Sequence, residues 1–331
     1  MAAARVVRAG HLAQGPEVAA LEAAVAAVAG CRHAVAVSSG TTALQLALSA
    51  LGLGQGDQVI VPSYACTALL HAVWAVGAQP VVADVDPASG NLDAERVRRC
   101  CGPRVRAAIV PHLFGAAAPV AAIAALGVPV VEDCAMALGA TRGGRPLGSL
   151  GSVAVCSFYA TKLVAAGEGG MVLTHDADLA ATVRGQRSYD GLPADRPRLN
   201  AKMTDLAAAV ARVQMDRLPD FIASRRRLAA RYAAALAGLG LALPAADTER
   251  VWYRYVVQTP DDATGLLQAV NQRGVAARRP VPNPLHLELG LPDAQFPGAS
   301  QAWRQNVSLP LYPTLTESEF DRVVEAVRRA C

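Results

Sequence analysis

The stretch VAVCSFYATKLVAAGEGGMVLT, residues 153–174, holds two apolar, β-rich runs with a single lysine between them. VAVCSF (153–158) and GMVLT (170–174) are typical of buried strands, since both are short, apolar and rich in β-branched residues. The GEGG segment at 167–170 permits a tight, irregular turn, because glycine adopts backbone conformations that other residues avoid. Lys162 is therefore predicted to lie in the connection between two buried strands.

Five more apolar runs precede this stretch, and helical patterns separate them. Seven continuous apolar strands alternating with helices predict an α/β domain whose mostly parallel sheet is covered by helices on both faces. The five earlier strands are expected at 33–38, 59–62, 80–86, 107–115 and 128–133.

The pattern changes after about residue 203. Two long segments have helical periodicity, TDLAAAVARVQMDRL (204–218) and FIASRRRLAARYAAALAGL (221–239), and Thr204 with Asp205 makes a suitable helix start. The remainder contains a strand, RYVVQT, and two further helices. We therefore expect a large domain at residues 1–235 and a small C-terminal α/β domain at 236–331.

Composition excludes several classes of protein. The chain has 331 residues, of which 53% are hydrophobic and 18% are charged, so it is too apolar for disorder. The net charge of +4 is small, and the tightest basic cluster, Arg225–Arg227, is interpreted as a solvated helix face. No nucleic-acid partner is expected.

Neither a membrane span nor a metal site is expected. Residues 107–131 carry no formal charge, but proline and glycine interrupt this run repeatedly. The N-terminal MAAARVVRAGHLAQG lacks the apolar core of a signal peptide. The seven cysteines form no C-x-x-C pair and no metal-ligand spacing, which favours a reducing, cytoplasmic location.

Lysine is rare in this chain. Of its 31 basic residues, only Lys162 and Lys202 are lysines, and the others are arginines. An arginine guanidinium stays protonated, whereas a buried lysine amine can lose its proton and form an imine. Coding bias is the simple explanation of the arginine excess. If the protein uses lysine chemistry, however, there are two candidates.

Polar residues stand where the predicted strands end, which is where open α/β sheets bind ligands. The turn Ser39–Thr42 leads from a strand into a helix, so its free N–H groups could bind an anion, or it could be an ordinary helix cap. Asp133 ends the strand VPVVED and is either a site carboxylate or a cap for the next element. Ser157 ends the strand before Lys162.

The order and spacing of these segments resemble the DegT/StrS-type aminotransferases, which are fold type I enzymes dependent on pyridoxal 5′-phosphate (PLP). The resemblance runs nearly end to end. It is carried by GHLAQGPEVAALEAAVA, AVAVSSGTTALQLAL, VIVPSYACTA, PVVADVDP, VPHLFG, VVEDCAMALGA, SFYATKLVAAGEGGMV, LNAKMTDLAAAVARVQMDRL and NVSLPLYPTLTESE.

The resemblance implies a role for individual residues. Lys162 corresponds to the lysine that forms a Schiff base with PLP, and Asp133 corresponds to the carboxylate that keeps the pyridine nitrogen protonated. Ser157 matches the hydroxyl that binds the cofactor phosphate, together with the backbone of Gly40, Thr41 and Thr42. Asn200 matches an asparagine that reaches the phosphate of the neighbouring subunit, so a homodimer with shared active sites is implied.

Three positions depart from the family pattern. Cys66 stands where an aromatic residue often stacks on the pyridine ring. Met136 stands where the family usually has a glutamine that hydrogen-bonds the 3′-oxygen of the cofactor, and a thioether cannot donate that bond. Lys202 replaces a common arginine. These changes leave the cofactor assignment in place and bear on the substrate.

The function implied is transfer of an amino group from glutamate or glutamine to a keto-sugar, a cyclitol or a related carbonyl acceptor in a biosynthetic pathway. The alternatives are a PLP enzyme with a nonstandard outcome, such as dehydration or deoxygenation, and a catalytically silent PLP-binding protein. Relatives that dehydrate keto-sugars carry histidine in place of the lysine, so Lys162 favours transamination. The candidate substrate residues are Tyr159, Arg278, Arg279 and His286.

Overall fold

A computed structural model describes residues 2–191, 193, 195 and 197–331. Seven strands form one sheet in the order β1-β9-β8-β5-β4-β2-β3. Only β9 runs against the others, which confirms the predicted, mostly parallel seven-stranded sheet. The strands are β1 (His33–Val37), β2 (Gln58–Pro62), β3 (Gln79–Ala83), β4 (Val105–Pro111), β5 (Val130–Asp133), β8 (Val153–Ser157) and β9 (Gly170–Thr174).

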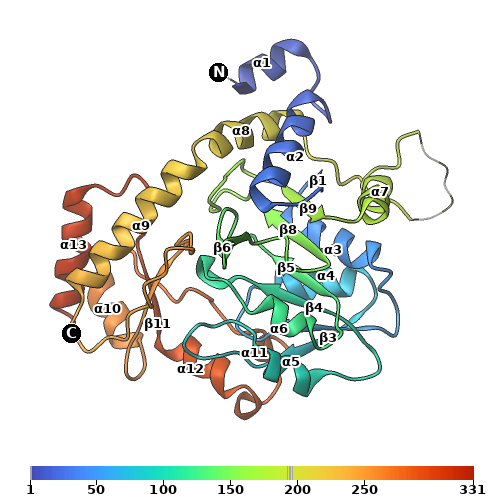
Figure 1. The fold of residues 1–331 in the computed structure, drawn as a ribbon. Coiled ribbons are helices and arrows are strands. Elements are labelled where there is room, and N and C mark those ends of the chain that lie inside the picture. The colour runs from blue at the N-terminus through green and yellow to red at the C-terminus, as the bar shows by residue number, and fades with distance from the viewer. Residues whose placement is uncertain (1, 192, 194, 196) are drawn as a thin grey trace.

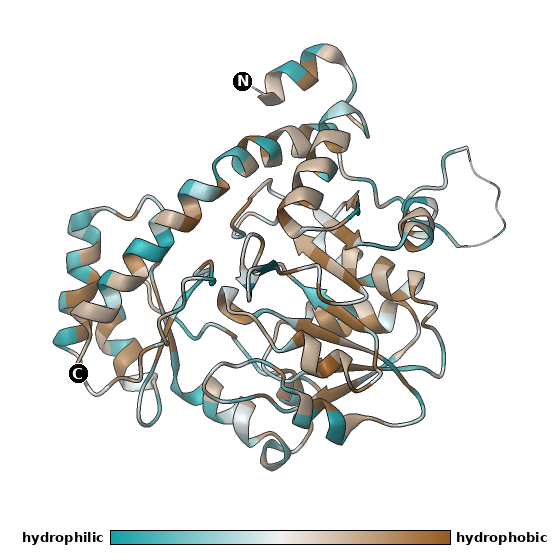
Figure 2. Cartoon of the chain, in the orientation of Figure 1, coloured by the Kyte–Doolittle hydropathy of each residue, from teal (hydrophilic) through white to brown (hydrophobic). Residues whose placement is uncertain are grey.

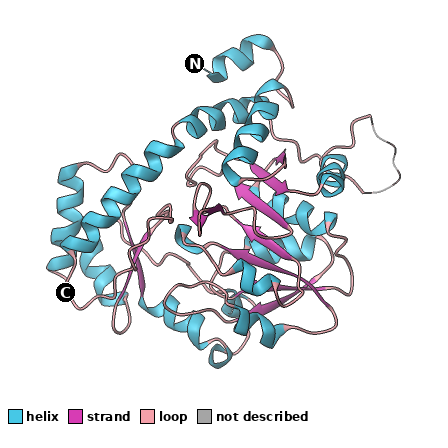
Figure 3. Cartoon of the chain, viewed as in Figure 1, coloured by secondary structure: helices cyan, strands magenta, loops and turns pink. Residues whose placement is uncertain are grey.

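Helices cover both faces of this sheet, as Figures 1 and 3 show. Because side chains alternate along a strand, Val35 and Val37 of β1 enter one core, and Ala34 and Ala36 enter the other. The helices around the sheet are α2 (Pro16–Ala29), α3 (Gly40–Ala50), α4 (Ala68–Ala75), α5 (Ala94–Cys100), α6 (Val120–Ala124), α7 (Ala177–Gln186) and α8 (Asp205–Asp216). Helix α1 (Ala2–Ala9) packs against α8 and projects away from the sheet.

The C-terminal part builds a separate core. It joins the antiparallel strands β10 (Tyr255–Gln258) and β11 (Asn306–Leu309) to the second half of α9 (Leu218–Ala235). The predicted domain boundary after residue 235 coincides with the end of α9 and stays a prediction. The remaining elements are β6 (Thr141–Arg142), β7 (Arg145–Pro146), η1 (Leu113–Gly115), α10 (Thr264–Gln272), α11 (Leu285–Glu288), η2 (Asp293–Gln295), α12 (Pro297–Gln305) and α13 (Glu317–Arg328).

The helix α9 corrects one expectation about charge. Arg225 is not on a solvated face, because only 7% of it is exposed. Its Nη1 donates to the carbonyls of Trp252, Tyr253 and Leu311 at 3.0–3.2 Å. Burial lowers the pKa of Arg225 to about 10. The guanidinium therefore ties α9 to the segments that flank β10 and β11, and only Arg227 of the cluster is exposed.

The strand predicted at 107–115 ends early. Strand β4 stops at Pro111, and the turn η1 follows, in which Phe114 has φ 56° and Gly115 has φ 85°. The hydrophobic pattern could not distinguish this turn from the strand, because Phe114 and Gly115 are buried as the strand residues are. Figure 2 shows the apolar strands enclosed by the helices. No helix in the described part of the chain is long and apolar enough to cross a bilayer.

Candidate active site

Lys162 and Asp133 come from the carboxyl ends of neighbouring strands. Asp133 is the last residue of β5, which pairs with β8, and Lys162 follows β8 by five residues. The Lys162 backbone N–H donates to the carbonyl of Tyr159 at 2.9 Å, which holds the turn. Its Nζ lies 5.4 Å from the ring centroid of Tyr253. The sheet topology thus brings both side chains to one edge.

Asp133 is a buried carboxylate with few partners. Its Oδ1 accepts a hydrogen bond from the N–H of Ala135 at 2.9 Å, and the described residues provide no second donor. Burial raises the pKa of Asp133, and the hydrogen bond from Ala135 and the charge of Lys162 oppose that rise. An incompletely satisfied carboxylate in a low-dielectric setting is suited to accept a hydrogen bond from a cationic ring nitrogen.

Cys66 faces the same site. It is accessible to solvent, yet desolvation by the surrounding protein raises the pKa of its thiol. The charge of Asp133 raises this pKa further, and that of Lys162 lowers it, so the three side chains lie close together. Met136 is half-buried nearby, three residues after Asp133.

A second set of residues forms an anion site. Ser39 caps α3, since its Oγ accepts from the N–H of Thr42 at 3.1 Å. The backbone N–H groups of Gly40 and Thr41 have no recorded acceptor among the described residues. A Cβ at Gly40 would lie 2.8 Å from the Cβ of Ser157 and 3.0 Å from its Oγ. The glycine therefore lets the helix N-terminus approach the Ser157 hydroxyl closely.

This geometry suits pyridoxal phosphate. The N-terminus of α3 and the Ser157 hydroxyl offer donors to a phosphate group. Asp133 offers an acceptor to a ring nitrogen, and Lys162 offers an amine to an aldehyde. The N–H of Thr42 already donates to Ser39 Oγ, so the free backbone donors are those of Gly40 and Thr41. Lys162, Asp133, Ser157, Gly40 and Thr41 therefore fit the cofactor, whereas the backbone contact predicted for Thr42 is already used within the chain.

The remaining predicted residues divide into two groups. Asn200 and Tyr159 are exposed, and Tyr159 lies three residues before Lys162. Arg278 is also exposed and lines a cavity beside Tyr253. His286, by contrast, is not accessible at the site of Lys162 and Asp133. His286 is fully buried, and its ring nitrogens contact Ser63 Oγ at 2.5 Å and Asp293 Oδ1 at 3.0 Å.

Arg279 is likewise held within the C-terminal part. Its guanidinium donates to the carbonyls of Trp303 and Arg304, and it pairs with Asp262 at 3.2 Å. It also lies over the Trp303 ring, 4.8 Å from the centroid. These contacts make Arg279 a structural residue, because they leave little of its hydrogen-bonding capacity for a ligand.

Sequence reasoning missed Glu132, the neighbour of Asp133. Glu132 is fully buried and accepts from Gly148, Leu150 and Gly151 at 2.5–3.0 Å, and it contacts His112 at 3.0 Å. Desolvation raises its pKa, but the hydrogen bond from His112 and the other donors outweigh this, so the pKa is lowered. The adjacent carboxylates in the segment VVED were the available signal.

The ligand atoms of His112, Glu132 and Cys134 lie within 4.8 Å of one another. This cluster is better understood as a hydrogen-bonded network than as a metal site. His112 Nδ1 accepts from the N–H of Ala118 at 3.0 Å, so Nε2 carries the proton that faces Glu132. Neither ring nitrogen then has a free lone pair for a metal ion.

Comparison with known proteins identifies relatives along the whole chain. The model of the DegT/DnrJ/EryC1/StrS aminotransferase family matches residues 1–328. The dTDP-3-amino-3,4,6-trideoxy-alpha-D-glucose transaminase of Streptomyces venezuelae is 38% identical, covering 99% of this chain and 90% of the relative. The UDP-N-acetyl-3-dehydro-alpha-D-glucosamine 3-aminotransferase of Acidithiobacillus ferrooxidans is 36% identical, covering 94% and 87%.

Solved structures agree with this relationship. S. venezuelae DesV in complex with a ketimine intermediate superposes with a TM-score of 0.94 at 38% identity, covering 99% of this chain and 92% of that chain. NtdA from Bacillus subtilis, solved with bound cofactor PMP, has a TM-score of 0.92 at 26% identity, covering 99% and 80%. PMP is the amine form of PLP, so the predicted cofactor is confirmed at the level of the family.

Proposed function

The chain belongs to the DegT/DnrJ/EryC1/StrS aminotransferase family, and we propose that it transfers an amino group from glutamate or glutamine to a nucleotide-linked keto-sugar. Two relatives are named for dTDP- and UDP-linked sugars, which supports a nucleotide-linked acceptor in a biosynthetic pathway. The observation that carries the proposal is the convergence of Lys162 and Asp133 at the carboxyl ends of β8 and β5.

Each residue has a distinct task in this proposal. PLP, when bound, supplies an electron sink that makes a proton on the substrate carbon acidic. Lys162 Nζ would accept that proton and deliver it to the carbon that was the cofactor's aldehyde, because one amine can act as base and then as acid. Asp133 keeps the ring nitrogen protonated, and Ser157 with Gly40 and Thr41 fixes the phosphate.

Two further features belong to the same proposal. Asn200 is exposed on the loop before α8, where it could contact the phosphate in the active site of a second copy of the chain. We propose a homodimer on this ground. A cytoplasmic location is proposed as well, because the free cysteines and the biosynthetic reaction suit a reducing compartment.

Chemical labelling tests the assignment of the lysine. The protein loaded with PLP is expected to be yellow, to bleach with glutamate or glutamine, and to recover its colour with a keto acid. Borohydride should reduce the imine and leave a stable label on Lys162, found by peptide mass spectrometry. The matched variants Lys162→Ala and Lys202→Ala separate the two candidates, since only the first should lose the label. A label on Lys202, or on neither lysine, contradicts the proposal.

A further inference from the structure

A cavity of about 430 Å³ opens beside Tyr253, on the side of the C-terminal part. Thr161, next to Lys162, lines it as well, and Thr161 Oγ1 lies 3.3 Å from the Tyr253 hydroxyl. Because Tyr253 also contacts Lys162, this ring connects the reactive amine to the cavity. A ligand in the cavity could therefore extend toward Lys162.

The cavity is strongly cationic. Its charged lining residues are four arginines and one glutamate: Arg225, Arg254, Arg278, Arg322 and Glu319. The buried Arg225 donates to three backbone carbonyls. The pKa of Glu319 is lowered mainly by the backbone N–H of Thr316 and to a smaller degree by the charge of Arg322, which therefore lies near that carboxylate. Arg254 and Arg278 remain, and neither has a carboxylate partner among the residues that the structure describes.

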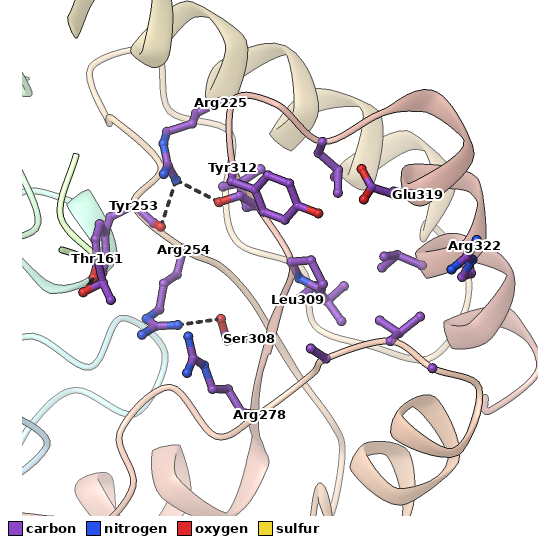
Figure 4. Close-up of a pocket in the computed structure, with 17 residues that line it drawn as sticks. Thr161, Arg225, Tyr253, Arg254, Arg278, Ser308, Leu309, Tyr312, Glu319 and Arg322 are labelled. Atoms are coloured by element: carbon purple, nitrogen blue, oxygen red, sulfur yellow. Dashed lines mark hydrogen bonds between the residues drawn. The ribbon is translucent and has the colours of Figure 1, made fainter. Parts of the chain in front are cut away.

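Backbone pairing fixes these two arginines next to each other. Arg254 immediately precedes β10, whose Tyr255 pairs with Leu309 of β11. Arg278 bridges to Ser308 of the same strand through two backbone hydrogen bonds, at 2.8 and 3.3 Å. The Nη1 of Arg254 donates to Ser308 Oγ at 3.3 Å. Figure 4 shows both guanidinium groups beside Ser308.

This arrangement has an electrostatic cost. Desolvation lowers the pKa of Arg254, and the positive charge of Arg278 lowers it further. Two cations held together without a counter-ion are relieved when an anion binds between them. Guanidinium groups match the paired oxygens of phosphates and carboxylates.

The rest of the cavity favours the larger of these anions. Beyond the arginines, most of its lining side chains are apolar, and the Tyr312 ring and Glu319 also line it. The cavity volume of about 430 Å³ is larger than a single carboxylate needs and is within the usual range for an organic ligand. The apolar lining residues are Val275, Leu309, Pro310, Leu311, Leu315 and Val323.

We propose that Arg254 and Arg278 bind the diphosphate of a nucleoside diphosphate, with the nucleoside against the apolar wall and the attached sugar directed past Tyr253 toward Lys162. This inference rests on the proposed function and deepens it, because it assigns the acceptor to a defined cavity. The two arginines then determine specificity for the acceptor, and the amino donor does not use them.

Calorimetric titration with dTDP, UDP, GDP and inorganic pyrophosphate tests the site without any turnover. Arg254→Gln and Arg278→Gln should each weaken binding of the preferred nucleotide by about tenfold or more, which is typical for loss of a charge-assisted hydrogen bond. Arg278→Lys should retain part of the affinity. Arg98→Gln, an exposed arginine of α5, is the matched control and should bind as the unmodified protein does.

The variants should melt at the same temperature as the unmodified protein, which would show that weaker binding does not reflect misfolding. Because Arg278 is exposed and Arg254 is half-buried, the substitution of Arg278 is a second, independent test. The glutamate-dependent change of absorbance should keep its concentration dependence in both variants. The inference is overturned if none of the probes binds, if the Gln variants bind them normally, or if glutamate affinity falls instead. Arginine-dependent nucleotide binding without a label on Lys162 would support the cavity and contradict the proposed function.

Discussion

Glu132 and Asp133 are adjacent carboxylates at the end of β5 that lie in opposite environments. Glu132 is surrounded by donors, and its pKa is lowered. Asp133 accepts one recorded hydrogen bond, and burial raises its pKa. Neighbouring residues on a strand point to opposite faces, so one carboxylate organises the fold while the other faces the site. The hydrogen bonding of the two carboxylates therefore makes Glu132 a structural group and leaves Asp133 available to a ligand.

Asp133→Asn should therefore separate stability from activity. Because the folded pKa of Asp133 is raised, its contribution to stability is present at low pH and is lost as pH rises through the folded value. At neutral pH the substitution should raise the melting temperature of the cofactor-free protein. It should retain cofactor colour and lose more than about tenfold in kcat, because a neutral amide holds the pyridine nitrogen protonated poorly.

Glu132→Gln is the matched control at the neighbouring position. The folded pKa of Glu132 is lowered, so its contribution to stability is present above the unfolded pKa and is lost as pH falls through the folded value. This variant should melt at a lower temperature near neutral pH, and its deficit should shrink toward acid. Near-normal turnover in Asp133→Asn would contradict the role given to that carboxylate.

At the scale of elements, a long-range cap holds the start of α2. Asp205, 1% exposed, accepts from the N–H groups of Gly15, Glu17 and Val18 at 2.8–3.2 Å. A Cβ at Gly15 would lie 2.6 Å from Asp205 Oδ2, so this contact requires a glycine. Helix α8 thereby fixes the N-terminus of α2 across 190 positions of sequence.

Asp205→Ala should lower the free energy of unfolding by about 2–4 kcal/mol, since three donors, two of them buried, lose a charged acceptor. Thr204→Ala removes only the local cap of α8, in which Thr204 accepts from Ala207 at 3.1 Å, and should cost about 1 kcal/mol. Urea unfolding of both variants measures the difference. Equal losses would mean that Asp205 acts as a local helix residue.

The sequence predicted the elements better than their contacts. Thr204 is confirmed as the start of α8, because capping is a local interaction. The link from Asp205 to α2 could not be predicted, since it depends on how two distant helices pack. The same holds for Arg225, whose three acceptors come from segments 27 to 86 residues away. Seven strands were found because apolar runs report burial directly.

The candidate site divides in the same way. Lys162, Asp133 and Ser157 were predictable because each ends or follows a strand, and the sheet brings strand ends together. Arg254, which lines the cavity, was not predicted from the sequence. Its lack of a carboxylate partner can be seen only once the positions of the surrounding carboxylates are known. His286 was misleading, since a histidine in a proline-rich segment gives no sign of complete burial.

At the scale of the whole molecule, the proposed homodimer makes a quantitative prediction about shared sites. If each active site takes Lys162 from one subunit and Asn200 from the other, defects at these positions can complement each other. Lys162→Ala removes the reactive amine, and Asn200→Asp places a negative charge beside the phosphate. Each variant alone should be nearly inactive. A hybrid dimer, however, has one site in which both residues are intact.

Co-expression of the two variants with different affinity tags should therefore restore activity. Random pairing makes half of the dimers hybrid, and each hybrid has one intact site of two, so about one quarter of normal activity is expected. Purification through both tags should raise this to about one half. Both numbers follow only if Asn200 acts across the subunit interface. If Asn200 served the site of its own chain, each hybrid would combine one site lacking Lys162 with one lacking Asn200, and no activity would return.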